Sequence, residues 1–575
     1  KGCKGQAFDE LEEKLGSTAI KFEIQIERLL KLIDQGEIAK VLEVSEPLLK
    51  AFPDSLSLLN VVSLANEKSG NFNAAVDNYE QVLKIVPNSP EAYNNMGNAL
   101  KDQGKLQEAI EAYNKALAIK PDYETARVAK LYQQARICDW DDIEEDRKLI
   151  PELGVSKNYI NPFTMLPLED APDRHCLRSE NYAKKRFKNK KFKLSSPRLK
   201  MPKRLRVGYI SPDFREHPLS YLLTRTLELH NRSHFKIYAY SCGGEDSGKM
   251  RERVENAVDV FVDIRKLSDH AAVKRIQKDE IDILIDLAGY TAGGRANIFQ
   301  YRPAPIQINY IGYPGSMGAD FIDYIIADQT LIPDQMQQYY KEKIIYLPNC
   351  YQPNDNTRVI SDKALTKSEM GLPDAGFVFC CFNNSYKITP TEFDIWMRLL
   401  GKIDKSVLWL SSSNKWAQKN LKEAASIRGI SSDRIVFAQN LPQADHLARI
   451  QLADLFLDTF NYNAGATATD ALWSGLPLIT KIGQGYTARM AGSILSAIGL
   501  SELIVTKEAQ YEELALRLAT IPGELIQIRK KLAENKLTTP LFDSELFTRH
   551  LENGYSQAYE LYFEGKSPDH VYVSE

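Results

Sequence analysis

The residue with the clearest chemical potential is Lys387, which follows an apolar segment at 377–384 (FVFCCFNN). A lysine at the end of a buried strand, beside the start of a helix, is well placed to neutralise a diphosphate leaving group. Further along the chain, a loop of small residues from Gly465 to Thr467 opens a predicted helix that carries Asp470. Such a loop suits phosphate oxygens, and a carboxylate one turn later suits ribose hydroxyl groups. These residue types are those of a nucleotide-diphosphate site.

Other polar side chains follow apolar segments in the same way. His446 and Arg449 lie one helical turn apart in LPQADHLAR, and His217 follows the segment at 205–211 (LRVGYIS). Each signal is weak when taken singly, because a lone histidine in a loop is more often structural than functional. Their value is that all of them fall at the carboxyl end of a predicted strand, where ligands of parallel sheets bind.

Two glycine-rich turns, YTAGGR and GYPGSMG, also follow predicted strands and include Thr291, Gly312 and Pro314. Glycines in such turns let backbone N–H groups approach an anionic or hydroxyl-rich ligand without a side chain in the way. The chain contains no G-x-G-x-x-G or G-x-x-x-x-G-K-[ST] motif, which disfavours a dinucleotide oxidoreductase and a P-loop NTPase. Asp286, before the first turn, is a secondary candidate for a base, although buried carboxylates at strand ends are more often structural.

Composition excludes several other classes of protein. The net charge is only −3 over 575 residues, so the charge of the whole chain does not favour binding to nucleic acid or to an anionic membrane. A basic run at 184–206 is best explained as a solvated linker. The seven cysteines form no C-x-x-C pair, so neither a disulfide framework nor a zinc site is indicated, and no metal is expected. No apolar stretch of about 18 residues and no secretory-type segment occurs, so we expect a cytoplasmic location without a membrane span.

The elements that must position these residues begin at about residue 204. Apolar strands separated by helices of about a dozen residues predict parallel sheets that are covered on both faces. The series breaks near 355–370, which predicts two Rossmann-like lobes, over 204–365 and 366–575, with a ligand cleft between them. The predicted strands are 205–211, 235–242, 259–264, 281–289, 306–314 and 323–329 in the first lobe, and 377–384, 407–413, 434–439, 454–459 and 476–480 in the second.

The first part of the chain repeats with a period of 34 residues. The recurring positions are Gly36, Gly70 and Gly104, and Pro53, Pro87 and Pro121. In the best repeat, at 89–122, the small residues Gly97 and Ala116 fall where two antiparallel helices must approach closely, and this pattern resembles the tetratricopeptide repeat. We therefore expect an all-α superhelix of about three repeats over 1–140 and a helical linker over 141–203. Stacked helix pairs of this kind form a concave surface for peptides or protein partners.

Several longer stretches resemble the O-linked N-acetylglucosamine transferase family, whose members join tetratricopeptide repeats to a two-lobed catalytic region of the GT-B type. The most specific stretches are SPDFREHP, RPAPIQINYIGYPGSMG, CCFNNSYKITP, SVLWL, QLADLFLDT and TDALWSGLP. The resemblance spans nearly the whole chain and is strongest to the bacterial branch, which has short repeat arrays. It implies inverting transfer of a sugar from a uridine diphosphate donor to Ser or Thr of a protein, with no metal and no cofactor.

The resemblance also implies roles for individual residues. His217 matches the histidine of the family's HP motif near the acceptor, and Lys387 matches the lysine that holds the diphosphate. His446 matches the histidine that stacks on uracil, with Arg449 at the family's spacing, and Asp470 matches the aspartate that binds the ribose. The remaining positions implied at the nucleotide are Asn384, Gln443, Gly465, Ala466 and Thr467, and those implied at the sugar are Thr291, Gly312 and Pro314.

The chain departs from the family in the diphosphate loop, where Gly465 and Ala466 stand in place of a histidine and a threonine. Asn384 replaces a glutamine of the animal enzymes, and Gln443 replaces a lysine near the base. UDP-N-acetylglucosamine is the first expectation for the donor, and a fucose-bearing guanosine nucleotide or another hexose donor is the alternative. The alternative outside this class is a peptide-binding repeat scaffold with a decayed transferase half, against which the presence of both His217 and Lys387 argues.

Overall fold

The computed structural model describes residues 22–33, 36–140, 144–156, 159–187 and 200–575. The chain forms two compact units, Lys1–Gln133 and Gln134–Glu575, each with its own apolar cores. Most of the basic run and part of the predicted linker, 188–199 and 141–143, lie outside the described residues. No helix in the described ranges combines the length and the apolar character that a membrane span requires.

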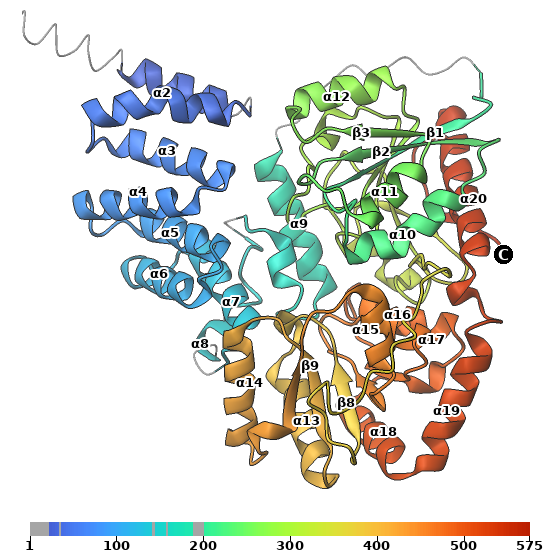
Figure 1. The fold of residues 1–575 in the computed structure, drawn as a ribbon. Helices are drawn as coiled ribbons and strands as arrows, with labels where there is room; N and C mark the ends of the chain where they lie inside the picture. The colour runs from blue at the N-terminus through green and yellow to red at the C-terminus, as the bar shows by residue number, and fades with distance from the viewer. Residues whose placement is uncertain (1–21, 34–35, 141–143, 157–158, 188–199) are drawn as a thin grey trace, which may run out of the picture. The chain divides into compact units, whose positions relative to one another are not determined.

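The first unit consists of helices that pack in consecutive pairs (Figure 1). They include α2 (Ile38–Ala51), α3 (Leu56–Ser69), α4 (Phe72–Ile85), α5 (Pro90–Asp102), α6 (Leu106–Ile119) and α7 (Glu124–Ile137), the last of which continues into the second unit. Gly70 and Gly104 follow α3 and α5 with φ values of 82° and 79°, a left-handed conformation that ends a helix and that glycine adopts without strain. At Gly97 an added Cβ would come within 2.6 Å of the Tyr113 ring. The repeating glycines at 70 and 104 are thus explained by the ends of helices, and Gly97 is explained by the close contact between α5 and α6.

Eight parallel strands form the first sheet of the second unit, in the order β14-β7-β6-β5-β4-β1-β2-β3. Their bounds are β1 (Leu205–Ser211), β2 (Phe235–Ser241), β3 (Val260–Asp263), β4 (Ile283–Asp286), β5 (Ile306–Asn309), β6 (Tyr324–Ala327), β7 (Lys343–Tyr346) and β14 (Val571–Tyr572). The connecting helices include α10 (Pro218–Leu229), α11 (Lys249–Asn256) and α12 (Asp269–Lys278). All residues of β4 and β5 are buried, as the continuous apolar segments predict for a sheet covered on both faces.

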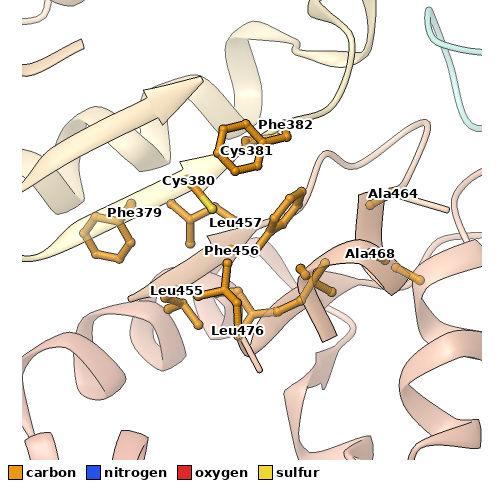
Figure 2. Close-up of a cluster of buried hydrophobic side chains, with 14 of the residues drawn as sticks. Phe379, Cys380, Cys381, Phe382, Leu455, Phe456, Leu457, Ala464, Ala468 and Leu476 are labelled. Carbon is orange, nitrogen blue, oxygen red and sulfur yellow. The ribbon is translucent and has the colours of Figure 1, made fainter. Parts of the chain in front are cut away.

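Six parallel strands form the second sheet, in the order β10-β9-β8-β11-β12-β13. Their bounds are β8 (Val378–Cys381), β9 (Val407–Ser411), β10 (Ile435–Ala438), β11 (Leu455–Leu457), β12 (Leu478–Lys481) and β13 (Ile504–Val505). The helices are α13 (Pro390–Lys402), α14 (Lys415–Ile427), α15 (Gln443–Ile450), α16 (Ala466–Trp473), α17 (Met490–Ala497), α18 (Glu508–Thr520) and α19 (Pro522–Asn535). Cys380 and Cys381, the last two residues of β8, are fully buried in this core as small apolar side chains (Figure 2).

The predicted fold class is confirmed, because a helical-repeat region precedes two Rossmann-like lobes. Each of the eleven predicted strands is present, and β7, β13 and β14 are additional. Along the chain, α8 (Glu144–Arg147) and α9 (Pro172–Arg186) follow the repeats and precede the strands of the lobes. This connection touches both lobes: Asp170 accepts hydrogen bonds from the backbone N–H groups of Gln484 and Gly485 in the second lobe, whereas Phe187 lies in a core of the first.

The end of the chain returns to the first lobe. Helix α20 (Ser544–Phe563) buries Leu551 and Tyr555 in the core of the first sheet, and Val571 of β14 pairs with Ile345 of β7. The second lobe predicted from sequence, 366–575, includes these elements, which return to the first sheet. The apolar face of α20 is covered by the first sheet, which is why the helix packs there.

Candidate active site

Each sheet has a topological switch point, and His217, Lys387 and Gly465 lie beside these two points. In the first sheet β1 lies between β2 and β4, and in the second β8 lies between β9 and β11. At such a point the loops that leave neighbouring strands diverge to opposite faces, which opens a crevice at the carboxyl ends. His217 follows β1, Lys387 follows β8, and the loop to Gly465 follows β11.

The two groups of residues lie on facing parts of the lobes. Helix α10, which begins just after His217, contacts α16, which begins just after Gly465. Burial, the neighbouring Glu216 and then the charge of Asp470 on α16 raise the pKa of the Tyr221 phenol on α10. Residues of both lobes therefore contribute to one candidate site.

His217 is the N-cap residue of α10. Its Nδ1 accepts a hydrogen bond from the backbone N–H of Leu219 at 3.2 Å. A nitrogen that accepts from a backbone N–H carries no proton, so the neutral ring carries its hydrogen on Nε2. Burial lowers the pKa of His217, whereas the charge of Asp213, whose Oδ1 lies 3.8 Å from Nε2, raises it. The neutral ring therefore offers a hydrogen-bond donor at Nε2 and no proton acceptor there.

The three positions implied at the sugar lie in two loops that touch each other. Thr291 is half-buried, and its hydroxyl donates to the carbonyl oxygen of Ala288 at 2.7 Å. Gly312 is so close to the other loop that an added Cβ would come within 1.8 Å of the Leu287 oxygen. Pro314 is buried in the same loop as Gly312. The structure thus brings the three residues to the carboxyl ends of β4 and β5, with glycine required by a backbone contact.

Asp286, the secondary candidate for a base, stabilises the turn that follows β4. Its Oδ1 accepts hydrogen bonds from the backbone N–H groups of Ala288 at 2.9 Å and Gly289 at 2.8 Å, and the residue is buried. Burial raises the pKa of Asp286 to about 6 although both hydrogen bonds lower it. This arrangement favours a structural role, because the carboxylate fixes the start of the loop that carries Thr291.

Lys387 is half-buried in the 3-10 helix η5 (Ser385–Lys387), just after β8. Its ammonium donates to the carbonyl oxygen of Asn463 at 3.0 Å and lies 3.8 Å from the centre of the Tyr462 ring. Burial lowers the pKa of Lys387 to about 8, whereas the charge of Asp458 raises it. Across the described part of the chain, no carboxylate lies within 4.0 Å ion-pair distance of this ammonium. A partly buried ammonium that has no carboxylate in contact with it is suited to bind an anionic ligand.

The loop before α16 combines small side chains with backbone donors. Gly465 has a φ of −113°, so the turn does not depend on the left-handed region that glycine favours. The hydroxyl of Thr467 donates to Asn383 Oδ1 at 2.6 Å, whereas Asn384, the first residue of the turn before Lys387, is exposed. The N–H groups of Ala466 and Thr467 have no acceptor among the described residues, as expected for the first turn of a helix. These amides are therefore available to an anion.

Asp470 is held by an ion pair that the sequence did not reveal. Its Oδ1 accepts from Arg358 Nη1 at 2.6 Å and from Gln443 Nε2 at 3.3 Å. Burial raises the pKa of Asp470, whereas the charge of Arg358 lowers it. Arg358 comes from the connection between the lobes, where no sequence signal points to it. Gln443 and Asp470 are thus neighbours, and within the described residues Oδ2 of Asp470 makes no hydrogen bond.

His446 and Arg449 contact each other on α15. Arg449 Nε donates to His446 Nδ1 at 3.0 Å, and the Phe382 ring packs edge-on to the imidazole with 5.5 Å between ring centres. Burial, followed by the charge of Arg449, lowers the pKa of His446 to about 3. The ring is therefore neutral at pH 7 and presents a flat surface of the kind on which a base can stack.

Sequence comparisons match both parts of the chain to known families. Residues 174–364 and 356–551 match the family described as glycosyl transferase family 41, and residues 68–104 and 90–123 match families of tetratricopeptide repeats. The interpretation of the first unit as tetratricopeptide repeats is therefore confirmed.

Similar curated proteins carry related names. The probable UDP-N-acetylglucosamine--peptide N-acetylglucosaminyltransferase SEC of Arabidopsis thaliana is 38% identical over 379 residues, which cover 65% of this chain and 39% of the relative. The UDP-N-acetylglucosamine--peptide N-acetylglucosaminyltransferase of Caenorhabditis elegans is 28% identical, over 64% of this chain and 42% of the relative. The chain thus spans about two fifths of the length of these relatives.

A solved structure shares the whole architecture. A mutant O-GlcNAc transferase of Thermobaculum terrenum matches with a TM-score of 0.68 at 24% identity, over 95% of this chain and 99% of that chain. This likeness supports the fold of repeats followed by two lobes. The family match covers more than half of the chain and includes both lobes of the candidate site. The chain therefore belongs to glycosyl transferase family 41.

Proposed function

We propose that this protein is an inverting, metal-independent protein O-glycosyltransferase that moves N-acetylglucosamine from UDP to Ser or Thr side chains. The observation that carries the proposal is the half-buried ammonium of Lys387 close to the N-terminus of α16, at the switch point of the second sheet. Both features bind anions, the ammonium through its charge and the helix through its free N–H groups and dipole. The names of the curated relatives support UDP-N-acetylglucosamine as the donor and peptides as acceptors.

In this reaction the acceptor oxygen bonds to the anomeric carbon from the face opposite the diphosphate. The bond between that carbon and the diphosphate oxygen breaks, and UDP leaves with the electron pair. Negative charge grows on the departing oxygen, where Lys387 and the amides of Ala466 and Thr467 stabilise it.

The acceptor hydroxyl also loses a proton, and His217 is poorly arranged to take it. Its Nδ1 is occupied by the Leu219 N–H, and in the neutral ring Nε2 already carries hydrogen. We therefore assign His217 the orientation of the acceptor through Nε2–H, and the proton passes to water or to a donor phosphate oxygen.

A panel of UDP- and GDP-sugars, each mixed with candidate acceptor proteins, tests the proposal through release of free nucleotide and labelling of protein. We expect UDP release and protein labelling with UDP-N-acetylglucosamine. Labelling with GDP-fucose alone would support the fucosyl alternative. If the protein neither binds a nucleotide nor releases one from any donor, the result would support the alternative of a repeat scaffold with a decayed transferase half.

Installing the family's residue pair in the diphosphate loop, Gly465→His with Ala466→Thr, should tighten UDP binding about tenfold or more. Each new side-chain hydrogen bond to a charged phosphate contributes about 1.5–3 kcal/mol. The φ of −113° at Gly465 admits a side chain, and its Cβ would come within 2.7 Å of Met490 Cε, the flexible end of that residue. Titration calorimetry with UDP measures the change.

The single variant Ala466→Thr separates the two contributions, because it adds a hydroxyl and leaves Gly465 unchanged. Unchanged UDP affinity in a double variant that melts like the parent protein would show that this loop does not hold the diphosphate.

Deleting residues 1–122 should reduce labelling of whole proteins at least tenfold while leaving hydrolysis of the sugar nucleotide nearly unchanged, because the repeats supply the protein-binding surface. The deletion keeps the end of α7, which is anchored in the second unit: the Arg136 carbonyl accepts from Ser385 Oγ at 2.7 Å, and the Ile137 carbonyl accepts from Asn420 Nδ2 at 2.9 Å. Parallel assays with whole proteins, short peptides and donor alone measure the effect. A folded truncated protein that is equally active in all three assays would contradict an acceptor role for the repeats.

A further inference from the structure

One peptide group beside the diphosphate loop lies between two opposite charges. The carbonyl oxygen of Asn463 accepts from the Lys387 ammonium at 3.0 Å, and the N–H of Ala464, which belongs to the same peptide group, donates to Asp458 Oδ1 at 2.7 Å. A peptide group that is bonded at one end to a cation and at the other to an anion is polarised along its dipole, and each hydrogen bond strengthens the other. Gly465 follows this peptide group directly, so its orientation sets the entry to α16.

The carboxylate of Asp458 is fully buried and holds three further donors. Oδ1 accepts from the Thr459 N–H at 2.9 Å and from Asn383 Nδ2 at 3.1 Å, and Oδ2 accepts from Thr480 Oγ1 at 2.7 Å. These donors come from the ends of three neighbouring strands, β11, β8 and β12. Asn383 in turn accepts from the hydroxyl of Thr467 in the first turn of α16. Asp458 thus joins the strand that precedes Lys387 to the loop that precedes the helix.

We propose that Asp458 is a positioning residue of the donor site, which fixes the 463–464 peptide group through hydrogen bonds and, through its negative charge, retains the positive charge of Lys387 for the leaving diphosphate. This inference rests on the proposed function, because it assigns Lys387 to the diphosphate. Asp458 touches neither donor nor acceptor in this role. It acts through the lysine and the loop.

The charged groups around this pair define the expected pH dependence. Lys387 is faced by Asp458 and by the Cys381 thiol, and burial lowers the lysine pKa to about 8 while both of these groups raise it. Asp458 is faced by Lys387, and its backbone carbonyl accepts from the Tyr511 hydroxyl. Burial raises the pKa of Asp458 to about 6, and Thr480, Ala464 and Lys387 lower it, so the carboxylate is ionised above neutrality.

One more acid titrates nearby. Burial raises the pKa of Glu392 on α13 to about 7, while its hydrogen bonds from Thr389 lower it. Glu392 raises the pKa values of Cys381 and Tyr511, whereas the charged groups that shift the pKa of Lys387 are Asp458 and Cys381.

The test is the pH profile of kcat/KM for the donor in Asp458→Asn, measured on the full chain as UDP release. The profile reports groups of the free enzyme. The asparagine keeps an oxygen for Thr459, Ala464 and Asn383 and an amide for the hydroxyl of Thr480, but it removes the charge. In the parent protein kcat/KM should fall as pH rises through the lysine pKa near 8. In the variant this fall should begin at least one pH unit lower, so that the loss of kcat/KM relative to the parent is about fivefold or more greater at pH 8 than at pH 6.

Thr480→Val is the matched control, because it removes one hydrogen bond to Asp458 at an equally buried position and keeps the charge. Its alkaline limb should stay within a few tenths of a pH unit of the parent. An Asp458→Asn profile that is parallel to the parent profile, or an equal displacement in both variants, would overturn the inference and leave the transferase activity standing. If Asp458→Asn does not fold, a displaced alkaline limb in Thr480→Val would equally overturn it, and an undisplaced limb would support it. A parent protein that releases no nucleotide from any donor would instead overturn the proposed function together with this inference.

Discussion

Replacing Lys387 with methionine is expected to reduce sugar transfer at least a hundredfold and to leave the melting profile unchanged. Methionine keeps the length of the side chain but removes the charge that meets the departing diphosphate, and losing one such stabilising group typically costs about 3 kcal/mol. Within the described residues this ammonium contacts one carbonyl oxygen and the face of the Tyr462 ring. The fold should keep its stability without it, because four other donors hold the Asp458 carboxylate beneath the loop. Initial rates of UDP release and protein labelling, measured beside scanning calorimetry, test both halves of the expectation.

Lys481→Met provides a matched control in the same lobe. Lys481 also ends a strand and lies over an aromatic ring, that of Phe460, but it pairs with Glu508 and has no proposed role at the donor. We expect this variant to keep transfer within a factor of about three, because a partly exposed ion pair contributes little. Turnover at the parent rate in Lys387→Met would remove the lysine from the proposed mechanism.

Replacing Gly312 with alanine is expected to destabilise the first lobe by about 3 kcal/mol or more and to reduce transfer at least a hundredfold. The new Cβ would lie 1.8 Å from the Leu287 oxygen, and a backbone atom cannot turn aside as a side chain can. The loops that carry Thr291 and Pro314 must therefore separate, which displaces these two of the three positions implied at the sugar. Denaturant unfolding and donor kinetics measure the two effects.

Gly315→Ala tests whether the effect is specific to that contact. In the same loop, a Cβ at Gly315 would have no neighbour closer than 3.7 Å, so stability and transfer should stay close to those of the parent protein. Equal losses in the two variants would show that the loop tolerates no substitution for another reason, and equal tolerance would contradict the backbone contact.

The strands and the carboxyl-end location of the candidate residues could be predicted from sequence because both depend on local patterns. Continuous apolar segments identify strands that are buried on both faces, and parallel topology brings their carboxyl ends to one edge. Lys387 and Gly465, which are 78 residues apart, thus meet near Asn463. The glycine periodicity of the first unit was equally informative, since Gly70 and Gly104 each end a helix in a left-handed conformation.

The features that the sequence did not predict depend on contacts between distant segments. Strands β13 and β14 are two residues long, too short for any periodicity, and α20 resembles any amphipathic helix until its covering sheet is known. Arg358 lies in an irregular connection, and only the fold places it on Asp470. The tautomer of His217 is set by the N–H of Leu219, a backbone contact that residue types do not encode.

The return of α20 and β14 to the first sheet makes the second lobe an insertion within the first. The two chain crossings lie side by side, because Asn354 Nδ2 donates to the Leu541 carbonyl at 3.0 Å and Ser544 Oγ donates to the Asn354 carbonyl at 2.8 Å. A segment whose two ends are adjacent can be exchanged between homologues without reshaping its host. Chimaeras that transplant donor recognition should therefore replace the segment 366–542 through two junctions. A single junction at 366 would pack the α20 of the homologue against the native first sheet. This would disturb the core of the first lobe, which is not part of the proposed nucleotide site.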